Sequence, residues 1–274
     1  MDIFHAVILG IIEGITEFLP ISSTGHLILS SKLLSLPETD FLKTFEISIQ
    51  LGAILSVVVL YWKKLLVNFE IFKRIVLAFI PTGILGLAFY KIVKTYLMGN
   101  EFVVLASLFV GGVILILFEV WYSKKEILKQ VQSLSSTRLG DDNEKSDDLE
   151  KISYKKSFFI GVFQSVAMIP GVSRSAATII GGLSMGISRK TIVEFSFLLA
   201  VPTMMAATGL DLLKNVGSFD SNQFGALVVG FVISFFVALL SIKWLLNFIK
   251  NHSFVSFGIY RIIISVVLGF FILY

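Results

Sequence analysis

Two short polar stretches inside otherwise apolar sequence carry the residues that could do chemistry. The first, EGITEFLPISSTGH, spans residues 13–26, and the second, PGVSRS, spans residues 170–175. Ionisable groups in membrane-embedded sequence cost about 2.5–3.5 kcal/mol each to insert, so they are usually functional. The first stretch supplies two carboxylates, hydroxyls and an imidazole, and the second supplies a guanidinium with further hydroxyls. This inventory suits chemistry on a phosphate group.

The two carboxylates, Glu13 and Glu17, are four residues apart and would share one face of a helix. Such a pair can hold a divalent cation such as Mg²⁺, or one carboxylate can act as an acid or base. A purely structural pairing or capping role is the alternative, and Glu13 is the weaker of the two candidates.

A hydroxyl-rich turn follows Pro20, which ends the first half-helix. The turn comprises Ser22, Ser23, Thr24 and Gly25. Its backbone N–H groups would open the second half-helix, and a helix N-terminus is an anion site. His26 lies three residues after Ser23, so the two could form an activated nucleophile with its base. At least one hydroxyl should be an N-cap, with Ser22 or Thr24 favoured over Ser23.

The second stretch repeats this design with a cation. Pro170 and Gly171 break the helix, and the next half-helix opens with Ser173, Arg174 and Ser175. The guanidinium of Arg174 offers a rigid fork for bidentate phosphate contact. Snorkelling of this arginine to the interface is the alternative, and a position just past a mid-segment break makes it difficult.

Other ionisable residues in apolar segments are given lesser roles. His5 and His252 lack acidic or hydroxyl neighbours in sequence and are expected at the interface, and Arg261 is expected to snorkel without a chemical role. Glu46 and Glu194 could support the site, but placement at the interface fits them equally well.

The composition predicts an all-α polytopic membrane protein. The 274 residues are 55% hydrophobic and 15% charged, with a mean hydropathy of +0.88, whereas soluble domains are about 25% charged. The net charge of +4 is attributed to lysines and arginines on the cytoplasmic side, so no nucleic-acid partner is expected. The chain has no cysteine, and its start does not resemble a removable signal peptide.

Six apolar segments are long enough to cross a bilayer about 30 Å thick. They are residues 44–62, 71–93, 102–121, 190–212, 223–246 and 254–273. Two further apolar segments, residues 3–34 and 157–186, are broken in the middle and are expected to form re-entrant helical hairpins.

The segments divide the chain into an inverted-topology repeat. Residues 1–122 form the first repeat, residues 123–156 a polar cytoplasmic loop, and residues 157–274 the second repeat. Pro20 and Pro170 lie 150 residues apart. Because each repeat then has a hairpin and three spans, the second must be inverted.

That offset places the residues of the two hairpins in a definite register. Glu13 and Glu17 correspond to Phe163 and Ala167. The polar groups of the two hairpins would therefore have diverged into complementary roles.

Lysines and arginines are concentrated in the loops on one side of the predicted topology. The positive-inside tendency assigns that side to the cytoplasm. Both termini and the opening of the site are then expected outside, and the tips of the two hairpins are expected to meet near the midplane.

The two stretches closely resemble the signatures of the bacterial undecaprenyl-diphosphatase (bacitracin-resistance) family, and the resemblance extends to KTFE at 43–46 and EFSFLLAVP at 194–202. It implies a membrane phosphatase that removes the terminal phosphate of undecaprenyl diphosphate. The monophosphate product carries peptidoglycan precursors for cell-wall biogenesis, and the activity confers bacitracin resistance. A location in the bacterial plasma membrane and a divalent cation, Mg²⁺ or Ca²⁺, are also implied.

The resemblance also implies roles for individual residues. Glu17, Ser23, His26 and Arg174 would be catalytic, with Ser23 the nucleophile, His26 its base or partner, and Arg174 a phosphate clamp. The metal would be held by Glu13 and Glu17. The remaining polar and glycine positions would bind substrate: Ser22, Thr24, Gly25, Gly171, Ser173 and Ser175.

Several alternatives stay open at this point. A secondary transporter or lipid flippase with a midplane anion site would use a similar architecture without hydrolysis. Within the phosphatase interpretation, Ser23 could form a phosphoenzyme, or water could attack directly with His26 as base. Oligomeric state, including a homodimer, is also open. Type-2 phosphatidic acid phosphatases are rejected because their lysine–arginine and late histidine–aspartate motifs are absent.

Overall fold

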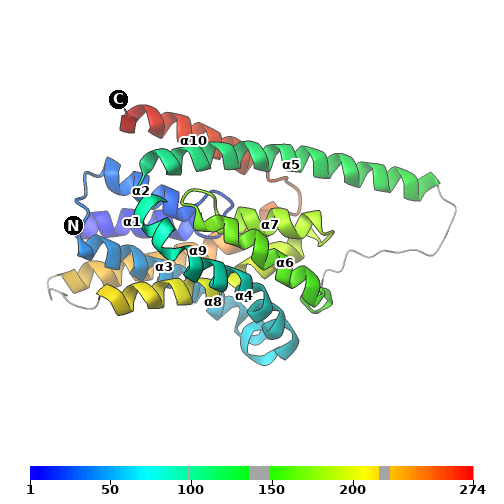
Figure 1. Cartoon of the computed structure of the whole chain (residues 1–274), viewed down its shortest axis with the longest axis horizontal. Coiled ribbons are helices and arrows are strands. Elements are labelled where there is room, and N and C mark those ends of the chain that lie inside the picture. The colour runs from blue at the N-terminus through cyan, green and yellow to red at the C-terminus, as the bar shows by residue number, and fades with distance from the viewer. Residues whose placement is uncertain (98, 136–147, 216–222, 274) are drawn as a thin grey trace.

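The computed structural model describes residues 1–97, 99–135, 148–215 and 223–273. Within these ranges the chain is helical without strands, which confirms the all-α fold (Figure 1). Six helices are long and apolar enough to cross a membrane, in agreement with the six predicted spans. The bounds of the six are α3 Asp40–Trp62, α4 Phe69–Ile92, α5 Glu101–Ser135, α8 Arg189–Asn215, α9 Phe224–Phe248 and α10 Val255–Leu273.

The two broken segments form pairs of short helices as predicted. The first pair is α1 Ile3–Thr16 with α2 Ser23–Leu33, and the second is α6 Tyr154–Ser165 with α7 Arg174–Ser184. In Figure 1 the first pair lies at the left end of the bundle and the second at the right, so the breaks of both face the middle of the molecule. This arrangement brings the polar stretches together.

One helix differs from the sequence-based expectation. Where a polar loop was expected from residue 123, α5 continues as helix to Ser135, and the next α-helix, α6, begins at Tyr154. Helical propensity explains the extension, because residues 123–135 include three lysines, two glutamines and two leucines and contain no glycine or proline. Most of the charged stretch 133–148 lies outside the described residues.

Close helix contacts at glycine reveal the repeat. A Cβ on Gly161 of α6 would lie 1.9 Å from the carbonyl oxygen of Ala78 in α4, and a Cβ on Gly10 of α1 would lie 2.8 Å from that of Gly230 in α9. Gly10 and Gly161 are 151 residues apart, and Ala78 and Gly230 are 152 apart. Each hairpin therefore packs its first helix, through an equivalent glycine, on a span of the other repeat.

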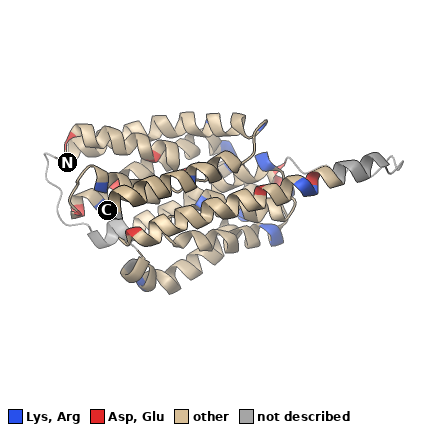
Figure 2. Cartoon of the chain, turned by 90° about the horizontal axis from the view of Figure 1, so that it is seen from above, with Lys and Arg blue, Asp and Glu red and all other residues tan. Residues whose placement is uncertain are grey.

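The basic side chains gather toward the end of the bundle that lies away from both termini (Figure 2). We call this the basic end. Its members in loops and helix ends include Lys63, Lys64, Lys73, Arg74, Lys124, Lys125, Arg189, Lys190 and Lys250. The described tryptophans, Trp62, Trp121 and Trp244, are about half exposed near the same end, as expected for side chains at a membrane interface.

Candidate active site

Two serines with unusual backbone geometry start the second helix of each hairpin. Ser22 has φ of 73° and Ser173 has φ of 75°, and each side chain caps its helix by accepting a hydrogen bond, from the N–H of Gly25 and Ala176 respectively. Non-glycine residues in this left-handed region are strained, and such strain concentrates at functional sites. Ser22 is therefore an N-cap as predicted, and the caps point two helix N-termini toward the middle of the bundle.

The caps also correct the register of the repeat. Ser22 and Ser173 are 151 residues apart, whereas the prolines before them are 150 apart. The second turn has one more residue between its proline and its cap, and this displaces the proline-based alignment by one. In the corrected register Glu13 corresponds to Gln164, and Glu17 to Met168, in place of Phe163 and Ala167.

Glu17 is the centre of the polar cluster. The Ser23 hydroxyl donates to Glu17 Oε2 at 2.5 Å, and Arg174 Nη2 donates to Glu17 Oε1 at 3.2 Å. Arg174 Nη1 also donates to the carbonyl oxygen of Ser196 at 2.7 Å. The side chains of Glu17 and Arg174 are only 4% and 9% exposed. The two hairpins thus contribute a carboxylate, a hydroxyl and a guanidinium to one buried network.

His26 has different partners from those expected. Its Nδ1 lies 2.7 Å from the carbonyl oxygen of Ser22, and its Nε2 lies 2.9 Å from the Tyr260 hydroxyl, while the two rings stack. A carbonyl oxygen only accepts, so Nδ1 carries a proton and Nε2 of the neutral ring accepts from Tyr260. The Ser23 hydroxyl donates its hydrogen bond to Glu17. Glu17 is therefore the acceptor beside Ser23 that His26 was expected to be.

Glu13 is fully buried beside this network. Neither of its carboxylate oxygens has a hydrogen-bond partner among the described residues, and its charged neighbours are Glu17, Glu46 and Arg174. The described part of the chain has no cluster of three or more histidine, cysteine or acidic side chains. An unpartnered carboxylate next to a second one nevertheless fits a hard divalent cation, which prefers oxygen ligands and keeps several waters.

Arg261 contacts both hairpin turns, although the sequence analysis assigned it no role. It is completely buried on α10 instead of snorkelling, and its guanidinium donates five hydrogen bonds to backbone carbonyl oxygens. The acceptors are Pro20, Ser107, Leu108, Gly171 and Val172. Since these carbonyls belong to both hairpin turns and to α5, one side chain holds both breaks in place. It also adds a positive charge behind the two helix N-termini.

The predicted residues meet around a cavity of about 140 Å³ between the two turns. The predicted residues that line it are Glu17, Ser22, Ser23, Thr24, Gly171, Ser173 and Arg174. Four predicted residues do not line it: Glu13, Gly25, His26 and Ser175. Of these, Gly25 donates its N–H to the Ser22 hydroxyl, and the Ser175 hydroxyl lies 3.3 Å from that of Ser173. Unpredicted members of the lining include Thr82, Gln164 and Thr203.

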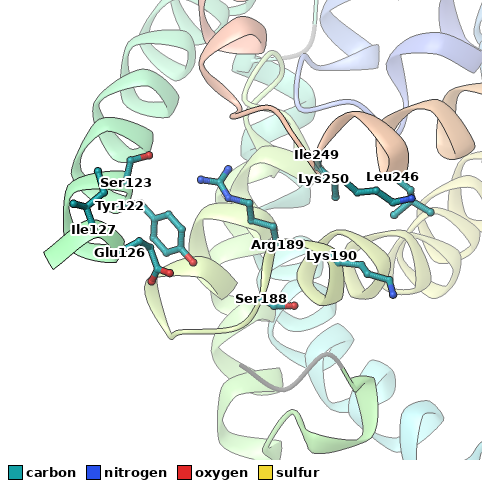
Figure 3. A pocket seen from close by; sticks show the side chains of 10 residues that line it. All are labelled: Tyr122, Ser123, Glu126, Ile127, Ser188, Arg189, Lys190, Leu246, Ile249 and Lys250. Carbon is teal, nitrogen blue, oxygen red and sulfur yellow. The ribbon is translucent and has the colours of Figure 1, made fainter. Parts of the chain in front are cut away.

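A second pocket, of about 490 Å³, lies at the basic end between α5 and the start of α8 (Figure 3). Arg189, at its centre, forms an ion pair with the buried Glu119 and lies over the ring of Tyr122. None of the predicted site residues line it. Two further acids are engaged elsewhere: Ser31 donates to the partly buried Glu46, and Lys64 donates to the buried Glu194 at 2.5 Å.

Comparison with known proteins agrees with the motif-based resemblance. A family model described as "Bacitracin resistance protein BacA" matches residues 6–267. A curated relative named undecaprenyl-diphosphatase from Aquifex aeolicus (strain VF5) is 52% identical over 274 residues and covers 100% of both chains. Similar relatives with the same name come from Persephonella marina, 52% identical over 100% of both chains, and Wolinella succinogenes, 48% identical over 99% of both.

Proposed function

Because the chain belongs to the bacitracin resistance protein BacA family, we propose that it is a membrane phosphatase that hydrolyses undecaprenyl diphosphate to undecaprenyl phosphate and inorganic phosphate. The observation that carries the chemical part of this proposal is the contact of the Ser23 hydroxyl with Glu17, beside Arg174. It joins a nucleophile, a base and a phosphate-binding cation in one buried cavity. The transporter alternative has no comparable support.

The diphosphate would be bound by positive potential from groups around the cavity, whose lining contains no lysine among the described residues. Arg174 presents a fork for phosphate oxygens, and the N-termini of α2 and α7 present backbone N–H groups. In the structure Arg174 contacts Glu17. A phosphate group competes for the same guanidinium, so substrate binding would release Glu17 to act as a base.

The reaction then proceeds at the terminal phosphorus. Ser23 Oγ attacks it in line, its proton passes to Glu17, and the bond to the bridging oxygen breaks to release undecaprenyl phosphate. Water next attacks the phosphoserine, the Oγ–phosphorus bond breaks, and a proton returns to Ser23. Direct attack by water would use the same carboxylate as base. Tyr260 donates to His26 Nε2, and His26 Nδ1 donates to the Ser22 carbonyl oxygen. The pair thus positions the turn.

The second carboxylate gives the site a place for a divalent cation. Glu13, with Glu17, would hold Mg²⁺ or Ca²⁺, and the ion would offset the negative charge of the diphosphate. The protein residues named above still bind the phosphate, orient it and move the protons.

The same family membership and six apolar helices make this a multi-pass membrane protein. We place the basic end in the cytoplasm of a bacterial cell, following the positive-inside tendency. Both termini and the opening of the cavity then face outward, and the prenyl chain stays in the bilayer against the apolar spans.

Phosphate release by the purified protein in detergent tests this function. Undecaprenyl diphosphate is incubated with and without Mg²⁺ and with a chelator. The proposal expects metal-dependent release of inorganic phosphate. A well-folded sample that releases none, and that instead moves a lipid phosphate across liposomes, would favour the transporter.

A further inference from the structure

The side-chain amide of Gln164, on α6, has an orientation fixed by its neighbours. Its Nε2 donates to Thr82 Oγ1 at 2.9 Å and to Thr203 Oγ1 at 3.1 Å. Each threonine hydroxyl uses its own proton elsewhere, toward the carbonyl oxygens of Gly161 and Leu199 respectively. Both hydroxyls can therefore only accept from the amide, so Nε2 must face them and Oε1 must face away.

That leaves an unused acceptor beside the cavity. Gln164 is 1% exposed, and its Oε1 has no hydrogen-bond partner among the described residues. Gln164 also lines the same cavity as Ser23, Glu17 and Arg174. Buried polar groups are normally satisfied, so an orphaned acceptor at a reaction cavity indicates a partner that arrives from outside the chain.

The chemistry of the cavity restricts what that partner can be. Phosphate oxygens are acceptors, so they would repel a carbonyl oxygen. Arg174 is not the partner, because its Nε and Gln164 Oε1 are both without a hydrogen bond among the described residues. A water molecule, by contrast, can donate one hydrogen bond to Gln164 Oε1 and still present a lone pair to phosphorus.

From this juxtaposition we propose that Gln164 is a positioning residue that holds the hydrolytic water of the second step. The inference rests on the proposed phosphatase function and on its Ser23 phosphoenzyme. The water donates a hydrogen bond to Gln164 Oε1 through one of its hydrogens. Glu17 first returns the proton that it received from Ser23 to Oγ, and the carboxylate that results then takes the other proton of the water. The oxygen of the water forms the new bond to phosphorus as the bond between phosphorus and Ser23 Oγ breaks, so the products are inorganic phosphate and the free Ser23 hydroxyl.

The register of the repeat supports a positioning role at this location. Gln164 is the counterpart of Glu13, and both present unpartnered side-chain oxygens near the end of the first half-helix. The carboxylate suits a cation, whereas the neutral amide suits a neutral ligand. The first hairpin would thus supply a cation site at Glu13, and the second hairpin a water site at Gln164.

The test is an acid quench of turnover with undecaprenyl diphosphate labelled in its terminal phosphate. Gln164→Met keeps the length of the side chain and removes the acceptor. We expect its kcat to fall about tenfold or more, with KM within about twofold of wild type and labelled protein accumulating. The matched control is Thr203→Val, which removes one partner of Nε2 but leaves Oε1, and which should accumulate no label.

Three outcomes would overturn the inference. One is a loss in Gln164→Met that appears in KM alone, which would indicate direct contact with substrate. Another is a higher Mg²⁺ requirement, which would make Gln164 a cation ligand. The third is a fall in kcat without labelled protein. If Gln164→Met does not fold, Gln164→Glu retains an acceptor oxygen and should accumulate no label, so accumulation there also overturns the inference.

Failure of the underlying function would look different. In that case wild-type protein releases no phosphate, or Ser23→Ala retains wild-type turnover, whatever residue stands at 164.

Discussion

Ser22 and Ser173 adopt the same left-handed backbone conformation, with φ of 73° and 75°, at the start of two half-helices 151 residues apart. Each caps its helix with its own hydroxyl. The residue that follows differs: Ser23 after the first cap and Arg174 after the second. The two repeats thus present the proposed nucleophile and the proposed phosphate-binding cation from equivalent positions, and the fold brings both to one carboxylate, Glu17.

Packing between the repeats should be sensitive at Gly161. In Gly161→Ala, the new Cβ would lie 1.9 Å from the Ala78 carbonyl oxygen, so α6 must move from α4. Overpacking of this kind costs about 1–3 kcal/mol, and thermal unfolding in detergent should show a lower Tm. Gly209→Ala is the control, because a Cβ there meets nothing within 4 Å. Equal Tm values for the two variants would contradict the close contact.

Arg174 should not tolerate replacement by lysine. Arg174→Lys keeps the charge but loses the planar fork that contacts both Glu17 and the Ser196 carbonyl. We expect kcat/KM for phosphate release to fall about 100-fold or more. The same change at Arg189, in the pocket at the basic end, should have a much smaller effect. Near-normal activity in Arg174→Lys would refute the clamp.

Loss of Arg261 should destabilise both hairpin turns together. Arg261→Met leaves five backbone carbonyls without their charged donor. We therefore expect the free energy of unfolding to fall by at least about 3 kcal/mol. Arg261→Lys should recover only part of it, because an ammonium group has three donors. The readouts are Tm and kcat in detergent. The control is Lys73→Met, at a half-exposed ion pair on the surface. If Tm is no lower for Arg261→Met than for this control, Arg261 does not hold the two turns in place.

The cation requirement should depend on Glu13. Glu13→Gln removes one negative ligand, so the Mg²⁺ concentration for half-maximal phosphate release should rise about tenfold or more. Glu46→Gln makes the same change at a partly buried acid whose carboxylate accepts from Ser31, and the Mg²⁺ requirement of this variant should change little. A titration in which the two variants behave alike would remove Glu13 from the cation site.

Much of this architecture could be predicted from the sequence. The six spans follow from runs of apolar residues, and the two breaks follow from Pro20 and Pro170 among hydroxyls. The cap at Ser22 follows from N-cap chemistry. These features depend on local sequence, so no knowledge of distant contacts was needed.

The remaining features depend on contacts between distant segments. Ser23 and His26 are close in sequence, yet the turn directs the hydroxyl back to Glu17 and the imidazole to Tyr260. Arg261 was missed because its five acceptors are backbone carbonyls, which no residue pattern reveals. The register was displaced by one because proline positions, unlike caps, do not define the start of a helix.

The most direct test of the account is whether Ser23 and Glu17 work as a unit. Phosphate release from undecaprenyl diphosphate is measured for wild type, Ser23→Ala, Glu17→Gln and the double variant, all checked for folding by Tm. Groups that act in one step are non-additive. The account predicts that each single variant loses about 10³-fold or more and that the double variant is no slower than either. Substantial activity in Ser23→Ala, or losses that multiply in the double variant, would contradict it.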